Sequence, residues 1–104
     1  MIARVWRGWT SPSQADAYQE HFDAAVLDHL RQIEGFQGAR LWRREDGGEV
    51  EFVAVTTFVS LDAVRAFAGA DHERAVVEPE ARRVLTRFDE RCRHYELAVS
   101  SGDE

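Results

Sequence analysis

The sequence has 104 residues, of which 44% are hydrophobic and 31% charged, a size and balance typical of one soluble domain. Thirteen basic residues against nineteen acidic ones give a net charge of −6. This charge argues against a nucleic-acid or anionic-membrane partner, because either requires a basic face. The one cysteine, Cys92, excludes an internal disulfide, and no apolar run approaches the ~18 residues of a membrane span. We expect a cytoplasmic protein with one domain over residues 1–99 and a flexible acidic tail over 100–104.

The first third of the chain predicts a strand followed by a helix. Residues 2–9 are rich in β-branched and aromatic types, which favour strands. Apolar residues then recur every three or four positions and predict one buried helix face, ending near Gly35. These residues are Tyr18, Phe22, Val26, Leu30 and Ile33.

The middle of the chain predicts a β-hairpin. Residues 36–46 and 49–59 have strand composition, and the Gly-Gly pair between them is a typical two-residue hairpin loop. A loop of two residues fixes the register and places Arg44 opposite Glu51. This pair of opposite charges contributes about 0.2–1 kcal/mol to the stability of a sheet.

The second strand of the hairpin is apolar on both faces. One face carries Phe52, Ala54, Thr56 and Phe58, and the other carries Val53, Val55, Thr57 and Val59, with Trp42 beside them by the hairpin register. A monomer would leave one of these apolar faces in water, which monomers rarely do. We therefore expect a homodimer formed through the sheet face.

The last part of the chain predicts a broken helix and a final strand. Ser60 begins a helix that ends near Gly69, Pro79 begins a further helical piece, and residues 91–99 read as a strand. The order β-α-β-β-α-β is the ferredoxin-like pattern of the α+β class. It predicts a four-stranded antiparallel sheet with both helices on one face.

The stretch AGADHERAVVEPEARRVL, residues 68–85, contains the leading catalytic candidate. His72 follows Gly69 at a joint between helix pieces, and histidine suits proton transfer near neutral pH. The alternative is structural, with Asp71 capping a turn that His72 merely occupies. A zinc-protease helix would need a second histidine four residues later, and Val76 stands there.

Two further sets of residues are candidates for binding. Arg4 and Trp6 share a face of the first strand and together suit an anionic or hydroxylated aromatic ring. Equally, Trp6 fills the core and Arg4 pairs with an acidic side chain. His94 and Tyr95 point to opposite faces of the last strand, and we expect His94 to be exposed and Tyr95 to pack in the core or the dimer seam.

Three segments carry a resemblance to a known family. MIARVWRGWT, GFQGARLWRRED and TTFVSLDAVRAFAGADHERAV, in this order of elements, resemble the antibiotic biosynthesis monooxygenase family of dimeric α/β-barrel proteins. The resemblance covers residues 1–99. It implies a cavity in each subunit between the sheet and the helices, and oxidation of aromatic polyketide anthrones without metal or flavin.

The residues that act in this family are largely replaced in this chain. The asparagine, tryptophan and tyrosine of the polyketide oxygenases fall on Ala54, Phe58 and Val64. The asparagine, tryptophan and histidine of the haem-degrading branch fall on Trp6, Phe67 and Val77. Because valine cannot ligate iron, haem degradation by that route is not expected.

The sequence thus predicts a pocket for a small aromatic molecule, lined by Arg4, Trp6, Thr56, Phe58 and Phe67, with His72 as the proton acceptor. The favoured activity is oxygenation of a phenolic, anthrone or quinol-like substrate with no cofactor or metal. Two alternatives stay open. One is a non-catalytic ligand-binding or accessory protein, and the other is a non-oxidative lyase, isomerase or cyclase.

Overall fold

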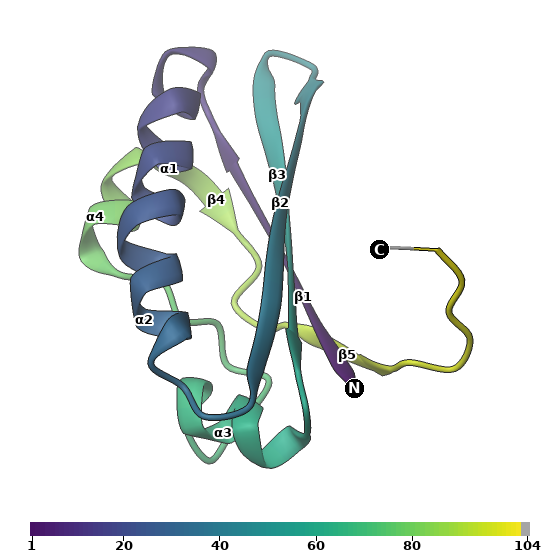
Figure 1. The fold of residues 1–104 in the computed structure, drawn as a ribbon. Helices are drawn as coiled ribbons and strands as arrows, with labels where there is room; N and C mark the ends of the chain where they lie inside the picture. Colours follow the sequence, from purple (N-terminus) through teal and green to yellow (C-terminus); the bar gives the residue numbers. More distant parts are fainter. Residues whose placement is uncertain (103–104) are drawn as a thin grey trace.

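An antiparallel sheet of five strands forms one layer, and helices cover one of its faces (Figure 1). The computed structural model describes residues 1–102. The strands are β1 (Ile2–Thr10), β2 (Phe36–Asp46), β3 (Glu49–Phe58), β4 (Leu85–Phe88) and β5 (Arg93–Glu96). The helical segments are η1 (Pro12–Gln14), α1 (Ala15–His21), the π-helical η2 (Phe22–Val26), α2 (Leu27–Arg31), α3 (Leu61–Ala68) and α4 (Pro79–Val84).

The sheet order is β2-β3-β1-β4, with β5 also paired to β1. This is the predicted ferredoxin-like arrangement, with one correction: two short strands replace the predicted fourth strand. β4 pairs with the end of β1 around Gly8–Thr10, and β5 pairs with its beginning around Ile2–Val5. Between β4 and β5 the backbone bonds instead to the segment before α4, where Glu90 accepts from Ala75 and Cys92 donates to Glu73.

The predicted hairpin register is confirmed. Arg44 lies opposite Glu51, Trp42 opposite Val53 and Asp46 opposite Glu49. The Arg44 Nε donates to Glu51 Oε1 at 2.8 Å. The alternation of β3 is also regular, since each residue that faces the helices is buried and each residue on the other face is partly exposed.

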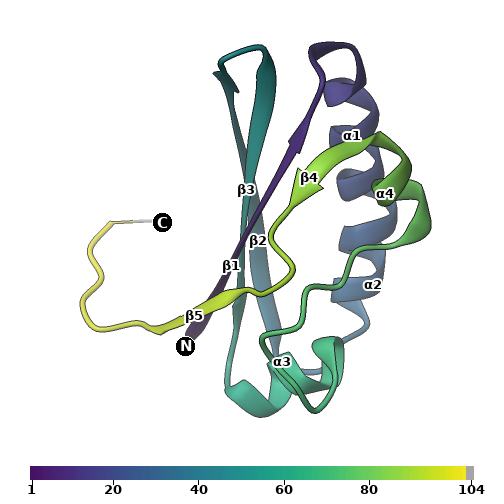
Figure 2. The same ribbon diagram turned by 180° about the vertical axis from the view of Figure 1, so that it is seen from behind.

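The helices all lie on one side of the sheet, which is clear when the molecule is seen from behind (Figure 2). The opposite face is open. Trp42 and Tyr95 on that face are 56% and 52% exposed, and Val53 and Val55 between them are partly exposed. The apolar face predicted from β3 and Trp42 is therefore present.

The chain after β5 leads away from the sheet without regular structure (Figure 1). The predicted acidic tail, residues 100–104, belongs here, although residues 103 and 104 lie outside the described part. No helix within residues 1–102 is long and apolar enough to cross a bilayer.

Gly8 permits a close approach between β1 and the side chain of Trp6. A Cβ at Gly8 would lie 2.4 Å from Trp6 Cη2 and 2.9 Å from Trp6 Cζ2. We predict that Gly8→Ala lowers the free energy of unfolding by about 1–3 kcal/mol, because the indole must leave its packed position. Urea unfolding measures this change.

Gly38→Ala is the matched control, because a Cβ on this β2 glycine would meet only Thr57 Oγ1 at an ordinary 3.6 Å. Equal effects of the two substitutions would contradict the close approach at Gly8.

Candidate functional site

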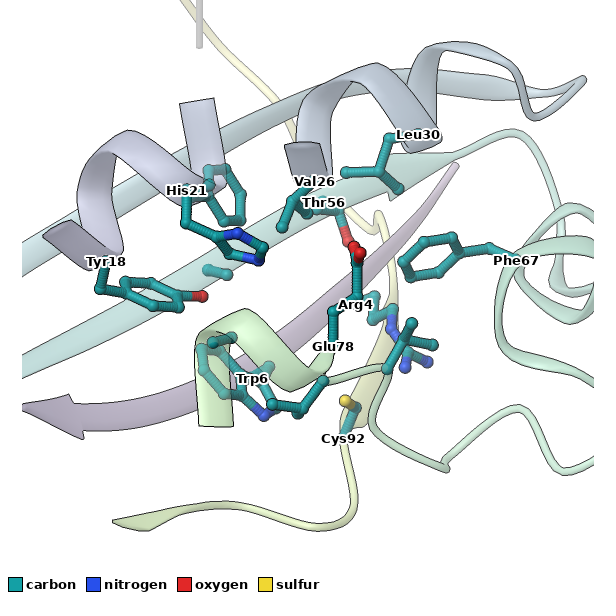
Figure 3. Close-up of a pocket in the computed structure, with 15 residues that line it drawn as sticks. Arg4, Trp6, Tyr18, His21, Val26, Leu30, Thr56, Phe67, Glu78 and Cys92 are labelled. Atoms are coloured by element: carbon teal, nitrogen blue, oxygen red, sulfur yellow. The ribbon is translucent and has the colours of Figure 1, made fainter. Parts of the chain in front are cut away.

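A cavity lies between the sheet, the long helix α1-η2-α2 and the segment that leads into α4 (Figure 3). The unfilled space among its side chains, together with the open solvent at its mouth, is about 520 Å³. Its lining is largely apolar and aromatic. The lining residues are Arg4, Trp6, Tyr18, His21, Phe22, Val26, Leu30, Ala54, Thr56, Phe67, Val76, Val77, Glu78, Ala81 and Cys92.

Trp6 is held in place by one hydrogen bond and by contacts with two aromatic rings. Its indole Nε1 donates to the carbonyl oxygen of Asp89 at 2.9 Å. Its ring lies 6.0 Å from that of Tyr18 and 6.4 Å from that of Phe88, between centroids. A fixed indole in the cavity wall offers a flat apolar surface to an aromatic ligand.

Arg4 is the buried cation of the cavity and is only 4% exposed. Its Nη1 donates to the carbonyl oxygen of His72, and its Nη2 to that of Arg74 at 2.7 Å. Its guanidinium carbon also lies 5.6 Å from the centre of the Phe67 ring. These contacts fasten the irregular segment between α3 and α4 to β1.

Nη1 of Arg4 also lies 3.1 Å from Nε2 of His94. Burial is the main factor that lowers the pKa of His94, to about 4, and the charges of Arg4 and His72 lower it further. His94 is therefore neutral near pH 7 and accepts from Arg4 through Nε2. Burial also lowers the pKa of Arg4 from its ordinary value, but an arginine in a protein stays charged at neutral pH.

The helix contributes two polar groups to the cavity, Tyr18 and His21. Nε2 of His21 is buried without a hydrogen-bond partner in the described structure. The hydroxyl of Tyr18, a residue only 3% exposed, has no hydrogen bond to another described residue. Burial raises the pKa of Tyr18 above its ordinary value, so this phenol remains a hydrogen-bond donor.

The π-helical segment η2 begins directly after His21. A π turn holds one more residue than an α turn, and such turns are frequent at functional sites. The wider turn coincides with the stretch where Phe22, Val26 and Leu30 all reach the cavity. The helix thus presents His21 and this apolar row to the same space.

The structure places four of the five predicted binding residues around this cavity: Arg4, Trp6, Thr56 and Phe67. The fifth, Phe58, is fully buried beside the cavity, in a core cluster with Phe36 and Phe67. It packs behind the wall rather than lining it. The binding roles of these residues remain predictions.

His72 does not contribute its side chain to the cavity wall. Its carbonyl oxygen binds Arg4, and its ring lies 5.0 Å from that of His94. The alternative, in which Asp71 caps a turn that His72 merely occupies, is also present in the structure. Asp71 Oδ1 accepts from the backbone N–H of Glu73 at 3.3 Å. A catalytic role of His72 stays a prediction.

The expectation that His94 is exposed is wrong. His94 pairs with Arg4 across β1 and β5, so it points to the helix side and is partly buried there. Tyr95 points to the open face of the sheet. Alternation along β5 sends the side chains of His94 and Tyr95 to opposite faces of the sheet. Which of the two faces the helices depends on the register of β5 with β1.

Sequence reasoning missed His21 as a cavity residue. A signal existed, because His21 follows Tyr18 by three residues and precedes Phe22, so it lies at the edge of the apolar stripe. Glu78 and Cys92 were also missed, because they reach the cavity through irregular segments. Burial raises the pKa of Cys92, although Arg4 acts against the shift.

Among residues 1–102, no three His, Cys, Asp or Glu side chains are grouped so as to hold a metal ion. Val77, which the resemblance aligns with the histidine of the haem-degrading branch, lines the cavity. Its side chain offers no atom that could ligate iron.

A ferredoxin-like sheet with a ligand-sized cavity under its helices defines a class of small α+β proteins. Within this class, the sequence model of the antibiotic biosynthesis monooxygenase family matches residues 1–79. The chain belongs to this family. None of the curated proteins matches the sequence significantly.

Several solved structures share the fold. A putative antibiotic biosynthesis monooxygenase from Bacillus cereus is 13% identical, with a TM-score of 0.68 over 98% of this chain and 97% of that chain. SnoaB, a cofactor-independent oxygenase from Streptomyces nogalater, is 20% identical, with a TM-score of 0.65 over 98% and 97%. The haem-degrader MhuD from Mycobacterium tuberculosis is 24% identical, with a TM-score of 0.62 over 98% and 100%.

The environment of His94 predicts a pH-dependent stability. Its pKa in the folded protein, about 4, lies below the ordinary 6.5, so on acidification the unfolded chain binds the proton first. Stability should therefore fall as the pH drops from about 6.5 towards 4. Urea unfolding at several pH values measures this, and NMR of the imidazole reports the titration directly.

His94→Gln is the control, because it removes this titration while keeping a polar side chain. The fall in stability between these pH values should be smaller in the variant than in the wild type. An identical fall would show that other groups cause it.

Proposed function

We propose that the cavity binds a small, flat aromatic molecule with an ionisable hydroxyl group and promotes its oxygenation by O2. The observation that carries this proposal is the unpartnered Nε2 of His21 beside the Tyr18 hydroxyl, in an otherwise apolar and aromatic wall. An imidazole nitrogen without a partner is placed to accept the proton of a bound hydroxyl group. The oxygenase SnoaB shares the fold and supports this class of reaction.

The reaction needs the anion of the substrate. His21 takes the hydroxyl proton, the Tyr18 hydroxyl donates a hydrogen bond to the oxyanion, and the positive charge of Arg4 favours an anion within the cavity. The cavity wall is largely apolar, and these interactions gain strength to the extent that a bound ligand displaces water from it. The electron-rich ring then packs against Trp6.

The anion transfers one electron to O2, which gives a substrate radical and superoxide. Their combination forms a C–O bond at the ring CH carbon that shares the negative charge with the oxyanion. The peroxide anion formed there takes the proton back from His21, and the product is a hydroperoxide. Loss of water then leaves a carbonyl group, with one oxygen atom in the product and the other in water. O2 is the oxidant, and the protein supplies proton acceptance, charge and exclusion of solvent.

Binding without turnover is the second candidate function. It is favoured by Ala54, Phe58 and Val64, which stand where the resemblance to the polyketide oxygenases implies asparagine, tryptophan and tyrosine. Ala54 lines the cavity without a polar group. A non-oxidative reaction in the same cavity would use His21 in the same way, but without consuming O2.

We also propose that two copies associate through the open sheet face. Trp42, Tyr95 and the valines of β3 expose apolar surface there, and a second copy would cover it by the same residues in a symmetric contact.

The proposed reaction predicts O2 uptake with anthrones, measured with an oxygen electrode. We expect His21→Gln to lower kcat about 10²-fold or more, as is typical for loss of a general base. His72→Gln should leave kcat within a few-fold of the wild type.

If His72→Gln abolishes uptake and His21→Gln does not, the sequence prediction of His72 is right and the assignment to His21 is wrong. Binding of these compounds without O2 uptake would replace the oxygenase proposal by the binding function.

The proposed dimer predicts sedimentation at twice the mass of the chain at micromolar concentration. We expect Trp42→Glu to shift the protein to the monomer, because it places a charge in the apolar contact. Ala25→Glu adds the same charge on the exposed surface of the helix layer and should leave the dimer intact. A wild-type protein that sediments as a stable monomer would rule out the dimer.

A further inference from the structure

The charge of Arg4 has only neutral partners within the described structure. Its guanidinium binds two backbone carbonyl oxygens, those of His72 and Arg74, and the Nε2 of His94. The carbonyls carry no net charge, and His94 is neutral near pH 7 because its pKa is lowered to about 4. No ion pair joins Arg4 to a carboxylate among residues 1–102.

A buried cation without a counter-ion is unusual. Charged side chains are rarely buried unless they are paired, because removal from water disfavours the charged form. Glu78 is the carboxylate that lines the cavity, and it forms no ion pair with Arg4 in the described structure. Cys92 also faces the cavity near Arg4, but burial raises the pKa of its thiol and keeps it neutral. Among the described residues, no negatively charged side chain of the cavity wall pairs with Arg4.

Arg4 still has donors for such a partner. A guanidinium group has five N–H donors, and its three contacts with His72, His94 and Arg74 leave two. The side chain lines the cavity, where Phe67 lies beside it. A carboxylate is matched to the remaining N–H groups by charge and by hydrogen bonding.

The polar groups of the cavity lie at separate ends. In Figure 3, Tyr18 and His21 are at one end and Arg4 and Phe67 are at the other, with Thr56 and Glu78 between them. Thr56, which is 6% exposed, contributes a hydroxyl to the same wall and has no hydrogen bond from its side chain to another described residue. Buried polar groups normally have partners, and among these groups the Nε2 of His21 has none in the described structure. A ligand with polar atoms at both ends would match this arrangement.

We propose that the natural ligand is an aromatic carboxylate, whose carboxylate group pairs with Arg4 and whose ring packs against Trp6 and Phe67. A hydroxyl group on the far side of the ring then lies towards His21 and Tyr18. The inference rests on the proposed function in using the same cavity and deepens it by naming the ligand class. It requires no turnover, so binding alone tests it.

The test compares benzoate with benzamide, which has the same shape but no charge. Binding to the wild-type protein is measured by calorimetry and by the fluorescence of the tryptophans, of which Trp6 lines the cavity. We expect benzoate to bind at least tenfold more tightly, since hydrogen bonds between charged groups are about twice as strong as neutral ones. Equal affinities, or no binding of benzoate at millimolar concentration, would overturn the inference.

Two variants locate the effect. Arg4→Gln should remove the preference for benzoate. Because it also weakens the bonds to His72 and Arg74, its fold is checked by circular dichroism and by the retained affinity for benzamide. Glu78→Gln removes the negative charge from the lining without touching Arg4, and should tighten benzoate binding several-fold but not benzamide binding. The site is not at Arg4 if two results are found together. In that case Glu78→Gln leaves the affinity for benzoate unchanged, and Arg4→Gln still binds benzoate more tightly than benzamide.

Arg31→Gln is the charge-matched control, because Arg31 is exposed at the end of α2. It should leave both affinities unchanged. If Arg31→Gln weakens benzoate binding as much as Arg4→Gln does, the preference reflects the overall charge and the inference fails.

The outcome separates the two proposals. A preference for benzoate without O2 uptake by any hydroxylated substrate rejects the oxygenase function and supports the ligand class. O2 uptake with anthrones that carry no carboxylate, but no preference for benzoate, supports the oxygenase function and rejects the ligand class.

Discussion

The cavity depends on one buried interaction, the contact of Arg4 with the backbone between α3 and α4. The guanidinium on β1 binds the carbonyl oxygens of His72 and Arg74, which lie 68 and 70 residues away in the chain. If this segment packed elsewhere, a buried cation would lose its acceptors, which is costly in a protein interior. From the outside, Arg91 binds Asp71 and Glu73 at 3.0 Å each. Two arginines thus hold an irregular segment against the sheet, and its continuation forms one wall of the cavity.

The same interaction connects folding with ligand binding. Neutral acceptors keep Arg4 in place through hydrogen bonds. These bonds position the guanidinium group but do not compensate its positive charge. The neutral state of His94 is part of this arrangement, because a protonated His94 could not accept from Arg4 and would repel it. A ligand that carries a negative charge would therefore stabilise the folded state as well as occupy the cavity.

The parts of the fold set by local pattern could be predicted, and the parts set by long-range backbone pairing could not. The alternation of β3 and the two-glycine loop determined the register that aligns Arg44 with Glu51. By contrast, the stretch 85–96 is mostly polar, and its division into β4 and β5 follows from bonds to β1 and to the segment around Glu73. In the cavity, Arg4 and Trp6 were predictable because alternation on one strand puts them on one face. For His21 the sequence shows only a place at the edge of the apolar stripe of the helix, and whether that edge faces the cavity depends on the packing of the helix over the sheet.

Three departures from an ordinary protein core border the same cavity. The helix widens into a π turn directly after His21, the Nε2 of that histidine is buried without a partner in the described structure, and Arg4 is buried without a carboxylate. Each departure lowers stability by itself, since regular helices, satisfied polar atoms and paired charges are the stable alternatives. Chains depart from these rules mainly at functional sites, where the stability is recovered elsewhere. Thr10 Oγ1 and His94 Nδ1 are also buried without a partner in the described structure, and neither residue lines the cavity, so one such atom alone marks no site. What distinguishes this cavity is that all three kinds of departure meet there.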